Sequence, residues 1–275
     1  MSKKKIQTPR ANKKLVLAVL QESKQKKLSL FTSMPKTLEG KRKKAERYMK
    51  LLETLVDFRC DDRNPYLIWL KQHKKIDLKF FFAFVNWWYW LSRYQPQTLW
   101  RIMSVFPDRA EQAEILPNAI EESGLRKKNH QPHWWHLEVL IKKLGGKLKP
   151  DSESEKMLND FLHIIDLATP AQTVGYISSI EFPGTTISSY FTTLITKVGK
   201  PKMIKSDFYI KVHTLVEYEH IIKSAGSMLL WMHDKKRQKK YGYKPGEIVE
   251  AFQRGMLFWE IFWKKGFGKL GYTKP

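Results

Sequence analysis

Segments with a helical spacing of apolar residues alternate with short breakers along most of this 275-residue chain. Between residues 37 and 58, for example, Tyr48, Leu51 and Leu55 recur at intervals of three and four, which is the period of an amphipathic helix. No stretch shows strand alternation joined by Asn-Gly or Asp-Gly hairpin turns. We therefore predict an all-α fold.

Glycine and proline mark the ends of most predicted helices. Ser206 is the predicted cap of the longest segment in the second half of the chain. The predicted helices cover residues 15–22, 37–58, 77–94, 97–106, 112–122, 133–144, 152–167, 170–181, 187–198, 207–233 and 246–265.

The net charge of +23 is concentrated near the start of the chain. Residues 1–50 carry 16 Lys and Arg against three Glu, a net +13, and the remaining 225 residues carry +10. We predict a basic, partly helical N-terminal extension over residues 1–60 and one helical domain over residues 61–275. The sequence has neither zinc-finger spacing nor an RNP-like motif, which argues against a nucleic-acid partner.

The cysteine count and the hydropathy both bear on where the protein works. Cys60 is the single cysteine, so the chain forms no internal disulfide, and we expect a reducing compartment, the cytoplasm. The longest nearly apolar run, residues 80–91, has 12 residues. A membrane-spanning helix needs about 20, so we expect no membrane span.

One motif carries chemistry: His213, Glu217 and His220 stand at positions i, i+4 and i+7. On an α-helix the three side chains fall within an arc of about 60°. The two histidines lie about 10 Å apart along the axis, too far to share one ion bound at about 2 Å from each nitrogen. Two ions about 3.5–4 Å apart, with the carboxylate between them, would fit. The motif therefore predicts half of a dinuclear metal site.

The other half must come from other helices, because ligands in helical bundles project inward from facing elements. Glu122 and His133 are two candidates, although His130 and His136 lie close enough to replace His133. Glu181 stands in an apolar segment, where a carboxylate is costly to bury without a metal or a Lys or Arg partner.

From about residue 64 to residue 267 the sequence resembles the haem-oxygenase-like diiron oxidases, also called iron-containing redox enzymes. The matching stretches are Asn64-Pro-Tyr-Leu with the aromatic helix after it, Asn118-x-x-x-Glu122-x-Gly124 with His133, the isolated Glu181, and His213-x-x-x-Glu217-x-x-His220 with the aromatic final helix. The resemblance implies a haem-oxygenase-like helical bundle. It also implies six metal ligands: Glu122, His133, Glu181, His213, Glu217 and His220.

The resemblance further implies an oxidoreductase that holds two iron ions per chain. Such an enzyme would use O₂ to oxidise a small organic substrate of the amine, amino acid or fatty acid type. An external electron donor is expected, and the resemblance is compatible with a homodimer.

Three alternatives also stay open. A ferritin-like diiron site would take Asp160 and His163 as its second helical pair and leave His133 and His213 without a role. A metal-free enzyme of the same fold would hold no iron. A non-enzymatic helical module would use the basic extension to bind an anionic partner.

Overall fold

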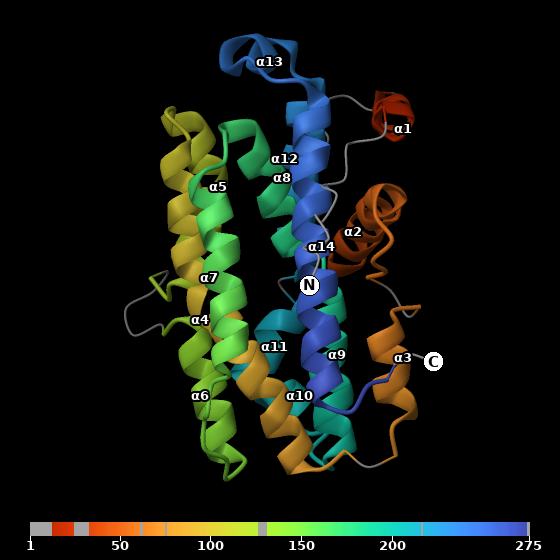
Figure 1. Cartoon of the computed structure of the whole chain (residues 1–275), viewed down its shortest axis with the longest axis vertical. Helices are drawn as coiled ribbons and strands as arrows, with labels where there is room; N and C mark the ends of the chain where they lie inside the picture. Colours follow the sequence, from red (N-terminus) through yellow and green to blue (C-terminus); the bar gives the residue numbers. More distant parts are fainter. Residues whose placement is uncertain are drawn as a thin grey trace, which may run out of the picture.

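The structure, a computed structural model, describes residues 13–24, 33–60, 63–74, 76–125, 131–215 and 217–273. Within these ranges the chain forms helices and contains no strand, so the predicted all-α class is confirmed (Figure 1). The helices assemble into an elongated bundle whose longest members run along its length.

The first elements in chain order are α1 (Lys13–Lys24), α2 (Leu38–Leu52), the short 3₁₀ helix η2 (Glu53–Leu55), α3 (Pro65–Gln72), α4 (Leu78–Val105), α5 (Arg109–Glu122) and α6 (His133–Lys143). They are followed by α7 (Ser152–Asp166), α8 (Pro170–Glu181), α9 (Gly184–Lys197), α10 (Met203–Ser206), α11 (Phe208–Leu215), α12 (Glu217–His233), α13 (Lys235–Tyr241) and α14 (Pro245–Lys269).

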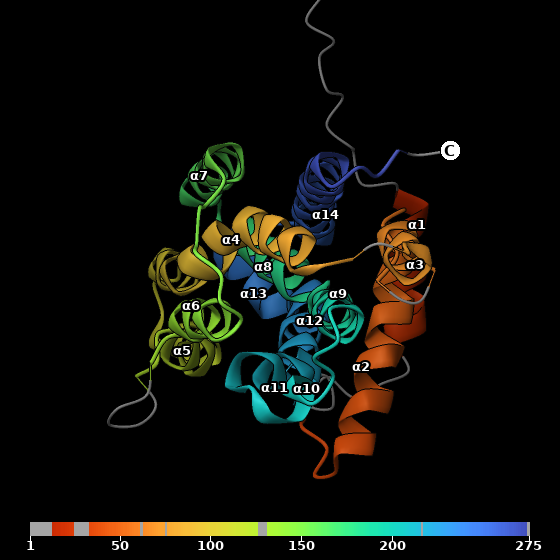
Figure 2. The ribbon, with the colours of Figure 1, turned by 90° about the horizontal axis from the view of Figure 1, so that it is seen from below.

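Helix α8 lies in the middle of the bundle, with α4, α12 and α14 packed around it (Figure 2). It crosses α14 so closely that only glycine fits at the crossing. A Cβ atom on Gly175 would lie 2.3 Å from the backbone oxygen of Ile248, and one on Gly255 would lie 2.5 Å from the Cβ of Ser179. The absence of a side chain at these two glycines therefore sets the distance between α8 and α14.

The end of α8 is held by a buried hydrogen bond from α14. Pro183 has no N–H, so the carbonyl of Ser179 four residues earlier has no helical donor. The indole Nε1 of Trp259 donates to that carbonyl instead, at 2.8 Å. This contact fixes the end of α8, where Glu181 is the last residue.

Helix α4 is a single helix, so the prediction of separate helices over 77–94 and 97–106 was wrong. Pro96 lies inside it and removes one backbone hydrogen bond. Aromatic packing outweighs that cost: Trp88 stacks on Trp263 of α14 with centroids 5.4 Å apart and planes 6° apart. Both indoles belong to the core.

The predicted helix over 207–233 appears as α11 and α12, separated by residue 216, which lies outside the described residues. Ser206 is not its cap. The side chain of Asp207 takes that place, because its Oδ1 accepts a hydrogen bond from the backbone N–H of Tyr209 at 3.0 Å. After α12, Asp234 caps a further helix, α13, which was not predicted separately.

The described part of the basic N-terminal extension packs on the bundle. Tyr48 and Leu52 of α2 are buried in the common core, and Lys41 forms an ion pair with Glu219 of α12 at 2.5 Å. In α1, the hydroxyl of Ser23 lies 2.7 Å from Nε2 of His233. The domain boundary at residue 60 stays a prediction.

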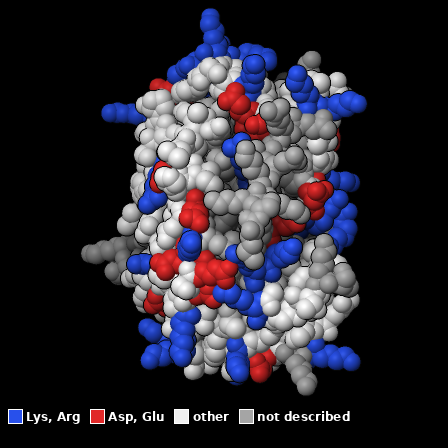
Figure 3. Space-filling view, in the orientation of Figure 1, with Lys and Arg blue, Asp and Glu red and all other residues white. Residues whose placement is uncertain are grey.

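Charged side chains are unevenly spread over the face seen in Figure 3. Lys and Arg project from the end occupied by α13 and from the edges, while acidic side chains gather near the middle. The run from Lys235 to Lys240 forms most of α13. In the part of the chain that the structure describes, no helix is both long and apolar enough to cross a membrane.

Candidate metal centre

Glu122 and His133 form a buried pair although ten residues separate them in the sequence. Glu122 is the last residue of α5 and His133 the first of α6, and Oε2 of the glutamate lies 2.9 Å from Nδ1 of the histidine. Gly124 makes this return possible. Its φ is +70°, and a Cβ there would lie 2.4 Å from the backbone carbon of Gln131.

Glu181 and His220 form a second buried pair, between α8 and α12. Oε2 of Glu181 lies 3.4 Å from Nδ1 of His220. The other carboxylate oxygen, Oε1, accepts hydrogen bonds from the amides of Asn118, at 2.9 Å, and Gln95, at 3.3 Å. No Lys or Arg in the described ranges forms an ion pair with Glu181, so of the two compensations considered for this carboxylate the Lys or Arg partner is not found, and its contacts are neutral amides and an imidazole.

His213 on α11 lies beside the first pair. Its ring centroid is 5.3 Å from that of His133. Its Nδ1 lies 2.7 Å from the backbone carbonyl of Tyr209, so Nδ1 carries the proton and Nε2 keeps its lone pair. The phenol of Tyr209 in turn accepts a hydrogen bond from Nε1 of Trp88 at 2.8 Å, which fixes this wall of the site.

The two pairs meet at one small cavity of about 40 Å³. Glu122, Glu181, His213 and His220 line it together with Gln95. With His133, which contacts Glu122, five of the six predicted ligands therefore come together from five helices: α5, α6, α8, α11 and α12. For the sixth, Glu217, the structure places the backbone at the start of α12, and its side chain lies outside the described residues.

The electrostatics of the cluster suit cation binding. Burial would raise the pKa of Glu122, but His133, His220 and His213 outweigh it and lower the pKa to about 2. Burial and the neighbouring His133 lower the pKa of His213 to about 4. At neutral pH the first residue is a carboxylate and the second a neutral imidazole, which are the states that bind metal ions. For His133, burial lowers the pKa but Glu122 raises it further, so the net shift is upward.

The distances within the pairs also fit metal binding. Two donor atoms bound at about 2.1 Å to one cation lie about 3.0–3.4 Å apart for bond angles between about 90° and 109°. The separations of 2.9 and 3.4 Å match this spacing. The Nδ1 of buried His133 makes no hydrogen bond, even though the carboxylate is close. Among the described residues no three such side chains already surround one point as a complete site, and Glu217 is not among those described.

Those rival ligands that the structure describes do not join this cluster. His136 packs against Phe208, with ring centroids 4.1 Å apart and the ring planes tilted by 35°, while His133 contacts Glu122. His130 lies outside the described residues. Asp160 and His163, which the ferritin-like alternative requires, are both exposed on α7.

Three residues that hold the site had no predicted role: Gln95, Tyr209 and Asn118, the last of which is part of the motif that contains Glu122. A signal existed for Asn118, which stands four residues before Glu122 and so shares its face of α5. Tyr209 stands four residues before His213 in the same way. Gln95 gave no signal, because it follows an aromatic run and precedes a proline.

The fold is shared with a solved bacterial protein. A crystal structure of a CadD-like protein of unknown function from Nostoc punctiforme matches with a TM-score of 0.61 at 17% sequence identity, over 84% of this chain and 99% of that chain. At this identity the likeness shows the fold alone, and it agrees with the predicted class of helical bundle. No family model matches the sequence, and no curated protein matches it.

Proposed function

We propose that this protein is a non-haem diiron oxidase or oxygenase that uses O₂ to oxidise a small organic substrate. The observation that carries the proposal is the burial of two carboxylate–imidazole pairs, with His213, around one cavity in an aromatic helical interior. Such groups are costly to bury unless a cation compensates the carboxylates. The resemblance to the haem-oxygenase-like diiron oxidases supplies the identity of the metal.

Each pair would contribute to one iron position. Glu122 and His133 would bind one ion, and Glu181 and His220 the other, with His213 and Glu217 completing the ligand set. When bound, the two iron ions would supply the electrons and open coordination positions for the reduction of O₂.

The remaining residues of the site would orient and shield these ligands. Asn118 and Gln95 hold one oxygen of Glu181 and leave the other to face His220. The carbonyl of Tyr209 holds the proton on Nδ1 of His213, as the second partner of a metal-bound histidine usually does. Trp88 and Trp259 line the cavity and limit the access of water.

The test is iron content and O₂ consumption of the full chain, loaded anaerobically with Fe(II). About two irons per chain and rapid O₂ uptake are expected, and His213→Ala should lower both. His163→Ala is the matched control, because that histidine is exposed on α7 and should change neither. O₂ uptake assayed with amines, amino acids and fatty acids would then identify the substrate.

Two outcomes would contradict the proposal. Folded protein with almost no iron would favour a metal-free enzyme of the same fold or a binding module. Loss of iron in His163→Ala but not in His213→Ala would restore the ferritin-like alternative.

A further inference from the structure

A second, larger cavity leads away from the candidate metal centre. It has a volume of about 190 Å³ and lies between α4, α5, α8 and α12. Glu181, His220 and Asn118 form one end of it, so it opens on the second ligand pair. Most of the remaining lining is apolar: Leu99, Phe106, Ile115, Val174, Ile177 and Trp231.

A buried carboxylate lies at the far end of this cavity. Glu111, in the first turn of α5, lines it and is only 6% exposed. Oε1 of Glu111 lies 3.7 Å from Nε of Arg237, longer than a hydrogen bond, and Oε2 has no hydrogen-bond partner. A buried acceptor left without a donor is costly, so its presence needs an explanation.

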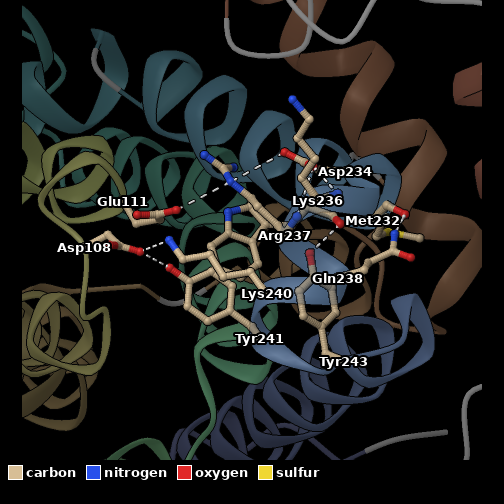
Figure 4. Close-up of polar contacts among 11 residues, drawn as sticks. Asp108, Glu111, Met232, Asp234, Lys236, Arg237, Gln238, Lys240, Tyr241 and Tyr243 are labelled. Carbon is tan, nitrogen blue, oxygen red and sulfur yellow. Dashed lines mark hydrogen bonds and ion pairs between the residues drawn. The ribbon is translucent and has the colours of Figure 1, made fainter.

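The neighbouring charges do not satisfy this oxygen (Figure 4). Arg237 divides its charge, because its Nε lies 3.7 Å from Asp234 as well as from Glu111. Lys240 and Tyr241 both bond to Asp108. Arg237 is thus shared between Glu111 and Asp234, while Lys240 and Asp108, which also contacts Glu111, bond to each other. Glu111 lines the cavity, and its Oε2 receives no hydrogen bond.

We infer that this cavity binds an organic ammonium compound, with the cationic nitrogen on Glu111 and an apolar stem that runs toward Glu181 and His220. A primary ammonium is the matching donor for a buried carboxylate, and charge-assisted hydrogen bonds of this kind are strong. As a substrate class for oxidation the assignment rests on the proposed function. The binding itself needs only the cavity and Glu111.

The geometry also sets the length of the ligand. Glu111 and Asn118 lie two turns apart on α5, about 10 Å along the helix axis. An extended chain advances about 1.2 Å per bond, so about eight bonds separate an ammonium on Glu111 from the metal centre. Octylamine is therefore a suitable probe, and it is protonated at pH 7.

Lys223 is the residue that would recognise an anionic ligand instead of an ammonium. It lines the same cavity one turn after His220, near the metal end. A fatty acid would place its carboxylate against Lys223 and would not use Glu111. The two modes therefore predict opposite preferences for the charge of the ligand.

The test measures binding of octylamine, octanoate and octanol to the metal-free full chain by tryptophan fluorescence, because Trp231 lines the cavity. Octylamine should bind at least about tenfold more tightly than the other two, and Glu111→Gln should remove that preference while leaving octanol binding intact. Glu53→Gln is the matched control: Glu53 is also buried, but it bonds to Arg63 and the backbone of Cys60, away from the cavity.

A second variant distinguishes loss of the cavity from loss of the fold. Ile115→Trp should fill the cavity and abolish binding of all three ligands, with a melting temperature near that of the unchanged protein. Tighter binding of octanoate, lost in Lys223→Met, would overturn the inference, as would equal octylamine affinity in Glu111→Gln or no binding of octylamine. Absence of iron from the protein would contradict the proposed function but would leave the preference for octylamine unchanged.

Discussion

Nδ1 of His220 lies 3.4 Å from Oε2 of Glu181, and the two residues come from helices that pack against each other in the middle of the bundle. Glu122 and His133 repeat the same combination on α5 and α6 at 2.9 Å. Both pairs are buried, and neither carboxylate has a Lys or Arg partner among the described residues. The interior thus holds negative charge in a form that a pair of metal ions could compensate.

The amide of Asn118 is predicted to position Glu181 for metal binding. In Asn118→Ala, Oε1 of Glu181 loses its shorter hydrogen bond and the carboxylate can turn away from His220. Such supporting contacts typically contribute 10–100-fold to metal affinity, so we expect a loss of about that size for the more weakly held iron. Competition with a chelator measures it, and a wild-type iron affinity would show that the amide has no positioning role.

Gly124 is predicted to control the pairing of Glu122 with His133. An alanine there must adopt a φ of +70° and would place its Cβ 2.4 Å from the backbone of Gln131. The returning chain must move, and the 2.9 Å contact should be lost. We expect Gly124→Ala to lower iron content by about one ion per chain. Gly145→Ala is the control, because that glycine also has a positive φ but nothing lies within 4 Å of its added Cβ.

The crossing of α8 and α14 provides a prediction about stability. Gly175→Ala would place a Cβ 2.3 Å from a backbone oxygen that cannot move without shifting α14. Overpacking of this kind costs about 1–3 kcal/mol of the free energy of unfolding. Gly268→Ala, in the same α14 but with open space around it, should be neutral or stabilise the helix by up to about 1 kcal/mol. Denaturant unfolding of both variants measures the difference, and equal stabilities would contradict this account of the crossing.

Two buried tyrosines predict the alkaline limit of stability. Burial raises the pKa of Tyr48 and of Tyr66 to about 12, whereas a tyrosine in the unfolded chain titrates near pH 10. Below about pH 10 both states keep the proton, so these residues add no pH dependence. Between about pH 10 and 12 only the unfolded state releases it, and the free energy of unfolding falls as the pH rises.

Denaturant unfolding at a series of pH values checks this. Tyr48→Phe should flatten the decline over the same window, since the phenylalanine cannot ionise. An equally steep decline in the variant would assign the alkaline loss to other groups.

The helices that begin and end at strong local signals were predicted well. α7 starts at Ser152 and α8 at Pro170, where Asp151 and Thr169 cap the first turns with their side chains. Pro96 misled the prediction because it lies inside α4, where packing of aromatic residues on both sides outweighs one lost hydrogen bond. Local signals determine helix ends, but only tertiary packing decides whether a proline ends a helix.

The site was predictable in part for the same reason. The spacing of His213 and His220 reflects a local period and can be read from the sequence. Which carboxylate faces each histidine depends on which helices lie opposite, and Glu181 meets His220 only because α8 runs through the centre of the bundle. Glu111 gave no sequence signal, because its importance comes from a cavity formed by four separate helices.

The most direct test is anomalous X-ray diffraction at the iron edge, on crystals of the full chain loaded with Fe(II) without oxygen. We expect two peaks about 3.5–4 Å apart. One should lie about 2.0–2.2 Å from the donor atoms of Glu122 and His133, and the other at that distance from those of Glu181 and His220. No peak in this cavity, or a peak beside Asp160 and His163, would contradict this expectation.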